Sequence, residues 1–223
     1  MAYLNELIFL SHLCVVLLFL RYAFRFGYEA LVALSVVQSI FANFFVMKSI
    51  TLFGLTVTCS DVFAVGSMIS LNLIQEFYSR EKSQQTVKLN FIFLIFFAIM
   101  SIFHLAYIPD SQDIAQSAYF LILGPAPRIV LASAITTFVV QYLDVQIFAL
   151  FARLLHKRSL SLRNFLSVVI SQTLDTLLFT IIGLWGVVAS VKDVFFMSLL
   201  IKCIVAACLA GSLNRLVRTG QRA

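Results

Sequence analysis

The sequence predicts an all-α membrane protein, a polytopic bundle of six to seven transmembrane helices. Of its 223 residues, 61% are hydrophobic and only 12% are charged, whereas soluble domains carry about 25% charged residues. Its apolar runs reach about 20 residues, the helix length that crosses a hydrocarbon layer about 30 Å thick. They also lack the alternation over about 10 residues that is typical of a transmembrane β-barrel. Composition and run length therefore exclude a soluble domain and favour helices in lipid.

Seven segments are long and apolar enough to cross a bilayer as helices. They cover residues 5–24, 28–47, 58–78, 89–108, 128–151, 164–188 and 194–214. The first resembles a secretory signal in position, but its run is long and no small-residue cleavage site precedes Arg21. We therefore expect an extra N-terminal helix over 5–24 beside a six-helix core over 28–214; without it, six spans remain. No linker interrupts the chain, so residues 1–223 are predicted to form one transmembrane domain.

One further apolar stretch, residues 118–123, is too short to span the bilayer. Gly124, Pro125 and Pro127 follow it and break a helix before Arg128. We expect an interfacial or re-entrant turn at this point.

The basic residues are distributed unequally between the two sets of loops. One set holds only Lys48 and Lys192, while Arg128 and Lys202 lie at membrane depth. The other set holds twelve: Arg21, Arg25, Arg80, Lys82, Lys88, Arg153, Lys157, Arg158, Arg163, Arg215, Arg218 and Arg222. Because cytoplasmic loops carry the excess of Lys and Arg, we expect an external N-terminus and a cytoplasmic C-terminus. The formal charge of +6 therefore reflects topology, and we expect no direct nucleic-acid partner.

Motifs for catalysis, cofactors or metals are missing from the sequence. The four cysteines form no CxxC pair, and the three histidines are too scattered for a metal site. The chain has neither a Gly-rich phosphate loop nor a nucleophile elbow. We therefore expect no enzyme, no catalytic residues, no cofactor, no metal and no ATP bound to this chain.

Several ionisable residues lie inside the predicted spans, where a charge costs about 2.5 to 3.5 kcal/mol and is a functional candidate by default. Asp175 lies near the midplane of the sixth span, Lys202 about a third of the way into the last, and Asp144 in the inner half of the fifth. Glu76 is close to the cytoplasmic end of the third span, and Arg128 is close to the outer end of the fifth.

Two of these carboxylates follow a glutamine at the same spacing. Gln141 precedes Asp144 and Gln172 precedes Asp175, so each pair lies on one face of its helix, and the two helices are consecutive and antiparallel. One interpretation is that buried charges pair, for example Lys202 with Asp175, and lock the helices together. The other, which we favour, is a polar cavity for a solute, with Asn43 in its wall.

The order of several short motifs resembles a known family. These motifs are Asn43…Lys48, Phe53-Gly54, Leu73-Ile74-Gln75-Glu76-Phe77-Tyr78, Arg128…Ala132-Ser133, Gln141-Tyr142-Leu143-Asp144, Ser171-Gln172-Thr173-Leu174-Asp175 and Ile201-Lys202. Over residues 30–205 the chain is similar to the YhhQ-type queuosine precursor transporters, formerly grouped as a vitamin uptake transporter family. It departs from their pattern at Asn72, where the family has an aspartate, and after Lys202, where Asp-Thr-Pro is absent.

The resemblance implies a multi-pass importer in the bacterial inner membrane for 7-deazaguanines that become the tRNA base queuosine. The cargo would be 7-cyano-7-deazaguanine, 7-aminomethyl-7-deazaguanine or queuine. A base of this kind needs carboxylate acceptors, an amide donor and aromatic walls. The implied substrate-binding residues are Asp175, Gln172, Asp144, Gln141, Lys202, Asn43, Glu76 and Arg128.

A second function class stays open on the sequence alone. The chain could be a membrane subunit that captures a small metabolite for uptake energised by separate ATPase subunits, with Ala206 and Ala210 seating a partner helix. The sequence also leaves open whether copies form a homo-oligomer and whether import is facilitated or proton-coupled.

Overall fold

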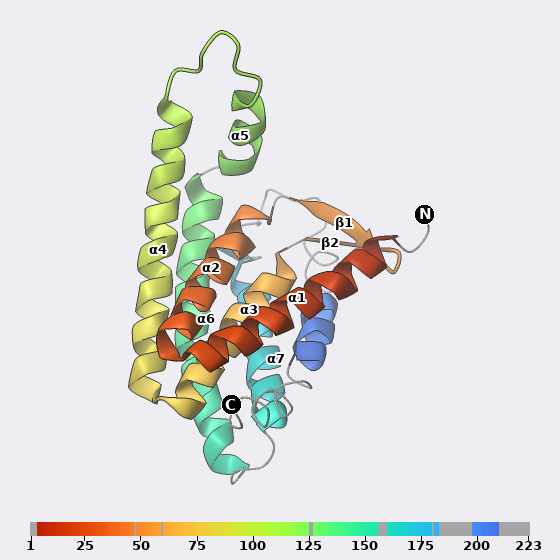
Figure 1. The fold of residues 1–223 in the computed structure, drawn as a ribbon, viewed down its shortest axis with the longest axis vertical. Coiled ribbons are helices and arrows are strands. Elements are labelled where there is room, and N and C mark those ends of the chain that lie inside the picture. Colours follow the sequence, from red (N-terminus) through yellow and green to blue (C-terminus); the bar gives the residue numbers. More distant parts are fainter. Residues whose placement is uncertain are drawn as a thin grey trace.

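The computed structural model describes residues 4–46, 48–58, 60–124, 127–155, 160–179, 181–182 and 198–209. Within them the fold is mainly helical, which confirms the all-α part of the prediction (Figure 1). The helices are α1 (Leu4–Phe26), α2 (Tyr28–Phe44), α3 (Asp61–Phe77), α4 (Arg80–Ala106), α5 (Gln116–Leu123), α6 (Pro127–Leu154), α7 (Leu160–Phe179) and an unlabelled helix, Ser198–Leu209.

A β-hairpin between α2 and α3 is the element that the sequence analysis did not predict. Its strands, β1 (Ser49–Leu52) and β2 (Leu55–Thr58), pair antiparallel around a turn at Phe53 and Gly54. Both turn residues have positive φ, 50° and 79°, as a two-residue hairpin turn of the primed type requires. The third span was expected to begin at residue 58, but the hairpin occupies that position and α3 begins at Asp61.

Helix α4 begins nine residues before the span predicted over 89–108. The Ser79 side chain accepts a hydrogen bond from the Lys82 backbone N–H at 3.1 Å and so caps the helix N-terminus. The charged first turns continue the same helix, and on their inner face the Ser83 hydroxyl donates to the Leu71 carbonyl of α3 at 3.1 Å. Charge therefore marks where the apolar span ends, but not where the helix ends.

The helices form a bundle in which α2 packs along α3, and α6 packs along α7 and α4. Helix α1 crosses obliquely over α2 and α3 (Figure 1). The far end of α4 extends beyond the bundle, and α5, the stretch expected to be too short to span, folds back beside it. Pro127 begins α6, a position where its missing N–H costs no helical hydrogen bond.

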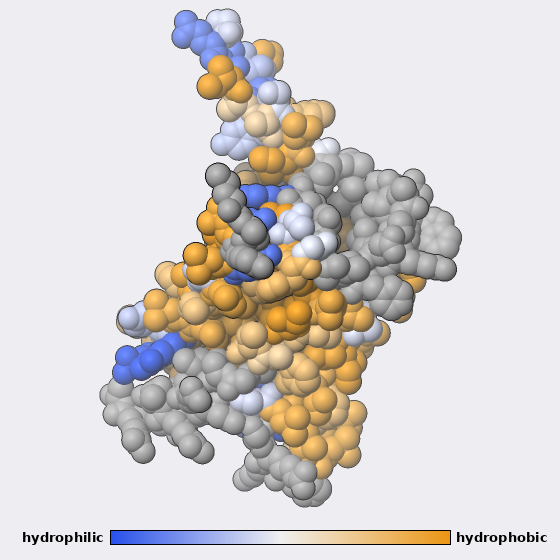
Figure 2. Space-filling view, turned by 90° about the vertical axis from the view of Figure 1, so that its right-hand side faces the viewer, coloured by the Kyte–Doolittle hydropathy of each residue, from blue (hydrophilic) through white to orange (hydrophobic). Residues whose placement is uncertain are grey.

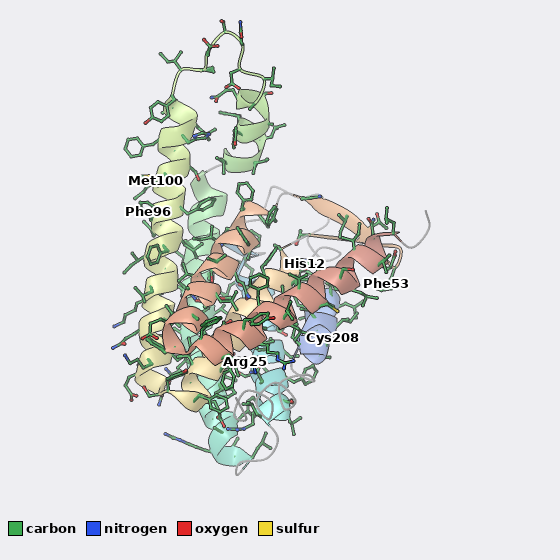
Figure 3. The ribbon with its side chains drawn as sticks, viewed as in Figure 1. His12, Arg25, Phe53, Phe96, Met100 and Cys208 are labelled. Atoms are coloured by element: carbon green, nitrogen blue, oxygen red, sulfur yellow. The ribbon has the colours of Figure 1, made fainter. Side chains whose placement is uncertain are left out.

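The outer surface of the bundle is apolar. Phe96 and Met100 point away from it on α4 and are 56% and 41% exposed (Figure 3). Hydrophobic side chains also dominate the body of the molecule in Figure 2, whereas the tip of the α4–α5 connection is hydrophilic. By length and composition α1, α4 and Ala132–Leu154 of α6 can cross a membrane, and α2 and Ser198–Leu209 are shorter apolar helices. Such a surface is stable in lipid and not in water.

The interior, in contrast, carries many polar side chains. Ser35 and Ser39 on α2 meet Ser67 on α3, with hydroxyl oxygens 3.1 and 2.8 Å apart. Gly66 lies beside them, where an added Cβ would stand 2.3 Å from the Gln38 side-chain oxygen. Small residues let the two backbones approach closely, as in other membrane bundles. This close contact between α2 and α3 fixes the positions of the buried polar side chains on the two helices.

Candidate functional site

Gln141 on α6 is the centre of a buried network that joins four helices. Its side-chain oxygen accepts a hydrogen bond from Asn90 on α4 at 2.9 Å. Its Nε2 donates to Ser39 and Ser67 at 3.3 and 3.2 Å, and Asn90 also donates to Ser35 at 3.0 Å. The carboxamide of Gln141 is therefore fully used within the protein.

Asp144, one turn further along α6, is completely buried and lies against α7. Its Oδ1 accepts hydrogen bonds from Ser167 and Ser171, each at 2.6 Å. Nearby, the Asn72 amide of α3 lies 3.5 Å from the Asn164 oxygen of α7. These hydrogen bonds join α3, α6 and α7, and all the side chains that take part in them are buried.

Glu76 at the end of α3 forms a bidentate ion pair with Arg163 in the first turn of α7. The Arg163 nitrogens donate to the two carboxylate oxygens at 2.9 and 2.6 Å. The Arg163 side chain is 7% exposed and that of Glu76 26% exposed, and the guanidinium also lies 5.7 Å from the centre of the Phe148 ring. We call this contact the inner ion pair. It joins the end of α3 to the start of α7.

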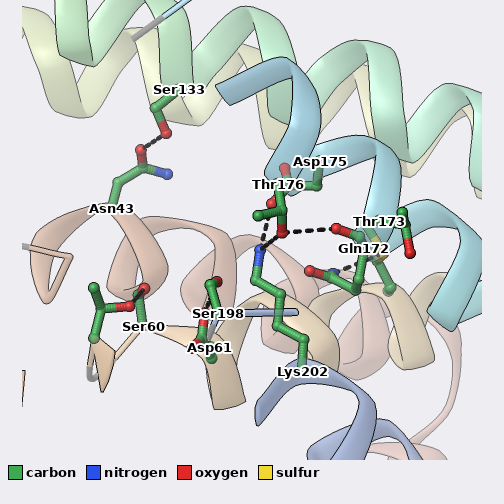
Figure 4. A network of polar contacts seen from close by, with 12 residues as sticks. Asn43, Ser60, Asp61, Ser133, Gln172, Thr173, Asp175, Thr176, Ser198 and Lys202 are labelled. Atoms are coloured by element: carbon green, nitrogen blue, oxygen red, sulfur yellow. Dashed lines mark hydrogen bonds and ion pairs between the residues drawn. The ribbon is translucent and has the colours of Figure 1, made fainter. Parts of the chain in front are cut away.

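Lys202 and Asp175 form a second ion pair, deeper in the bundle (Figure 4). The Lys202 ammonium donates to Asp175 Oδ2 at 2.7 Å and to the Thr176 hydroxyl at 3.2 Å. Gln172, one turn earlier on α7, is fully buried, and among the described residues its Nε2 donates only to the thioether sulfur of Met68, at 3.0 Å. Its Oε1 has no hydrogen-bond partner among the described residues. We call these four polar residues of α7 and the last helix the central cluster: Gln172, Asp175, Thr176 and Lys202.

A cavity of about 460 Å³ lies between α2, α4, α5 and α6. Its wall is mostly apolar and includes Phe44, Phe97 and Phe179. Its polar groups include Asn43 and Ser133, which hydrogen-bond to each other across the α2–α6 gap (Figure 4). Asn43 is thus the predicted site residue that lines this cavity.

The sequence analysis placed Gln141 with Asp144 and Gln172 with Asp175 around one cavity. In the structure the two pairs have different surroundings. Gln141 and Asp144 bind partners on α2, α3, α4 and α7, whereas Gln172 and Asp175 belong to the central cluster. Lys202 binds Asp175, the arrangement that the sequence analysis gave as the alternative to a free cavity. The side chain of Arg128 lies outside the described part of the structure.

Arg163 is a residue whose position the sequence analysis misjudged. It was counted with the loop cations, yet only 5% of the residue is exposed and it binds Glu76. A signal was present: Arg163, Ser167, Ser171 and Asp175 recur every four residues, which marks one polar stripe along α7.

The two glutamines are expected to respond differently to replacement by leucine, which has a similar size but cannot hydrogen-bond. Gln141→Leu leaves Asn90 and two serines short of partners, so the free energy of unfolding should fall by about 1 to 3 kcal/mol. Gln172→Leu gives up one contact to a weak acceptor and should leave stability nearly unchanged. SDS unfolding of the purified variants measures both; equal losses would contradict this assignment.

The apolar exterior and the membrane-length helices define a multi-pass helical membrane protein. Comparison with known proteins agrees. The model of a family described as "Putative vitamin uptake transporter" matches residues 58–213. The chain belongs to this family, which confirms the resemblance found in the sequence.

A curated relative from Bacillus subtilis (strain 168) carries the name "Probable queuosine precursor transporter". It is 32% identical over 177 residues, which cover 79% of this chain and 76% of the relative. No solved structure matches the chain.

Proposed function

We propose that the chain is a bacterial inner-membrane importer of 7-deazaguanine precursors of queuosine. Its family and the name of the Bacillus subtilis relative support this proposal. The structural observation that carries it is Gln172, a fully buried carboxamide whose oxygen has no partner among the described residues. A buried polar group without a partner costs free energy, and a ligand that supplies the missing donor recovers it.

The central cluster offers the groups that the base requires. A 7-deazaguanine presents N–H donors and a carbonyl acceptor on its Watson-Crick edge, together with a flat aromatic face. Asp175 and Gln172 Oε1 supply acceptors, while Lys202 and Gln172 Nε2 supply donors. In this proposal the base replaces the weak contact between Gln172 and Met68. It also forms hydrogen bonds with Asp175 and Lys202, which remain paired with each other.

The remaining predicted site residues take other places in the same proposal. Asn43 lines the cavity through which the base approaches. Gln141 and Asp144 hold the helices from inside, and Glu76 closes the inner end through Arg163. Arg128 keeps the substrate-contacting role that the family pattern implies.

We also propose that the chain crosses the membrane six or seven times as one domain, with its basic end and C-terminus in the cytoplasm. The Lys82 ammonium lies 4.7 Å from the centre of the Tyr28 ring, which brings the starts of α2 and α4 to one end of the bundle. Arg25 is at the same end, far from the α4–α5 tip (Figure 3). This clustering supports a single cytoplasmic face.

The described residues do not favour the alternative of a capture subunit driven by separate ATPases. Ala206, which was expected to seat a partner helix, is fully buried in the core of this chain. Ala210, the other residue of that pair, lies outside the described residues.

Rescue of tRNA modification tests the proposed function. The chain is expressed in bacteria that can neither make nor import queuosine precursors, and each of the three bases is supplied in turn. We expect queuosine to return to tRNA with at least one base, as measured by mass spectrometry of tRNA digests. An exposed-loop variant, Asp113→Asn, should rescue equally well. Absence of queuosine with all three bases, despite normal membrane levels of the chain, would contradict the proposal.

A further inference from the structure

Asp61 is a buried carboxylate that the family pattern and the proposed base site leave without a role. It begins α3, at the opposite end of this helix from Glu76. The residue is 2% exposed, and its Oδ1 accepts a hydrogen bond from Ser198 at 3.3 Å (Figure 4). Its Oδ2 has no hydrogen-bond partner among the residues that the structure describes.

The charges of the described residues around Asp61 do not balance. Lys202 interacts electrostatically with Asp61 as well as with Asp175, which it binds at 2.7 Å. Among the residues that the structure describes, two carboxylates therefore share one ammonium, which leaves a surplus of one negative charge. On α1, which packs against α3, the His12 ring lies tilted against the Phe63 ring, with the two ring centres 4.6 Å apart.

An unpaired carboxylate in a low-dielectric interior is unstable unless a proton or a cation neutralises it. A metal ion fits poorly, because it needs several oxygen ligands and would meet the Lys202 ammonium. Among the described residues there is no group of three or more acidic, histidine or cysteine side chains that could hold a metal. A proton needs one oxygen, and Asp61 Oδ2 is available.

We propose that Asp61 binds the proton that drives import of the base. The proton arrives from external water and forms an O–H bond at Oδ2, while the Lys202–Asp175 ion pair keeps its charges. When the site opens to the cytoplasm, this O–H bond breaks and water takes the proton. The inference rests on the proposed function, since it makes import by this chain proton-coupled, with one proton carried per base.

Transport by purified protein in liposomes tests the coupling. Labelled 7-cyano-7-deazaguanine and, in parallel, labelled queuine serve as probes, with the membrane potential held at zero by valinomycin and equal potassium. A gradient of one pH unit, acid outside, should concentrate the base about tenfold inside for a stoichiometry of one proton. Asp61→Asn mimics the protonated state and should still exchange internal for external base, but lose this accumulation. Asp113→Asn, an exposed carboxylate, is the matched control and should behave as wild type.

Three results would overturn the inference. Asp61→Asn could accumulate the base as well as wild type does, or a sodium gradient could drive accumulation in place of the pH gradient. Wild type could also exchange the base without accumulating it. A wild type that exchanges neither of these bases, nor 7-aminomethyl-7-deazaguanine, contradicts the proposed function instead. In that case infrared spectra of the purified protein still test the proton site. We expect a protonated-carboxyl band that Asp61→Asn loses and Asp113→Asn keeps; identical bands in all three proteins would refute proton binding at Asp61.

Discussion

Replacing Asp175 by asparagine is expected to lower the initial rate of uptake by about tenfold to a hundredfold while the protein still inserts. The substitution keeps the shape of the side chain but removes the charge that binds the Lys202 ammonium at 2.7 Å. A hydrogen bond to a charged group contributes about 1.5 to 3 kcal/mol, which corresponds to this range in rate. Uptake of labelled base into cells, normalised to the amount of protein in the membrane, measures the effect.

The double variant Asp175→Asn with Lys202→Met separates binding from packing. If Asp175 only balances Lys202, the single variant leaves an unpaired ammonium, folding suffers first, and the second change restores both folding and uptake. If Asp175 binds the base, the double variant folds but does not transport. We expect the second outcome. Recovered uptake in the double variant, or normal uptake by well-inserted Asp175→Asn, would remove Asp175 from the binding site.

Replacing Arg163 by methionine is expected to have the largest effect on stability. It leaves the Glu76 carboxylate without its two-pronged partner at 2.6 and 2.9 Å. Breaking a buried ion pair costs about 3 to 5 kcal/mol, and we expect about 3 because Glu76 retains some contact with solvent. SDS unfolding of the purified protein gives the value.

Two further variants make this stability prediction specific. Arg153→Met removes an exposed cation from the end of α6 and should change stability little. Adding Glu76→Gln to Arg163→Met removes the unpaired charge and should recover much of the loss. An equal effect of Arg153→Met and Arg163→Met, or no recovery in the double variant, would show that the inner ion pair does not hold α3 against α7.

Long apolar runs and helix breakers were enough to predict most of the fold. Pro127 marks the start of α6, and the short stretch at residues 118–123 lies within α5. The hairpin at Ser49–Leu52 and Leu55–Thr58 was missed because its β-branched residues around Phe53-Gly54 lie next to an apolar helix. Hydropathy does not distinguish an apolar hairpin from the end of an apolar helix, whereas the residues that favour a tight turn do.

The polar residues of the candidate site were found from the sequence, and the pairing of Lys202 with Asp175 was one of its two interpretations, but the other partners were not found. Each carboxylate or amide stands out because lipid-facing helices lack such groups. Whether such a group has a hydrogen-bond partner depends on residues far away in the sequence. The Gln141 side chain binds Asn90 and Ser67, whereas among the described residues the Gln172 side chain binds only Met68. Sequence spacing treats these two glutamines alike, and only helix packing separates them.

Uptake by the chain alone tests the central claim most directly. Liposomes containing only this purified protein are given labelled 7-cyano-7-deazaguanine, 7-aminomethyl-7-deazaguanine or queuine, without ATP or any other protein. We expect saturable uptake of at least one base, inhibited by unlabelled deazaguanines and unaffected by adenine. Folded protein that takes up none of the three, but gains uptake when ATPase subunits are added, would contradict it.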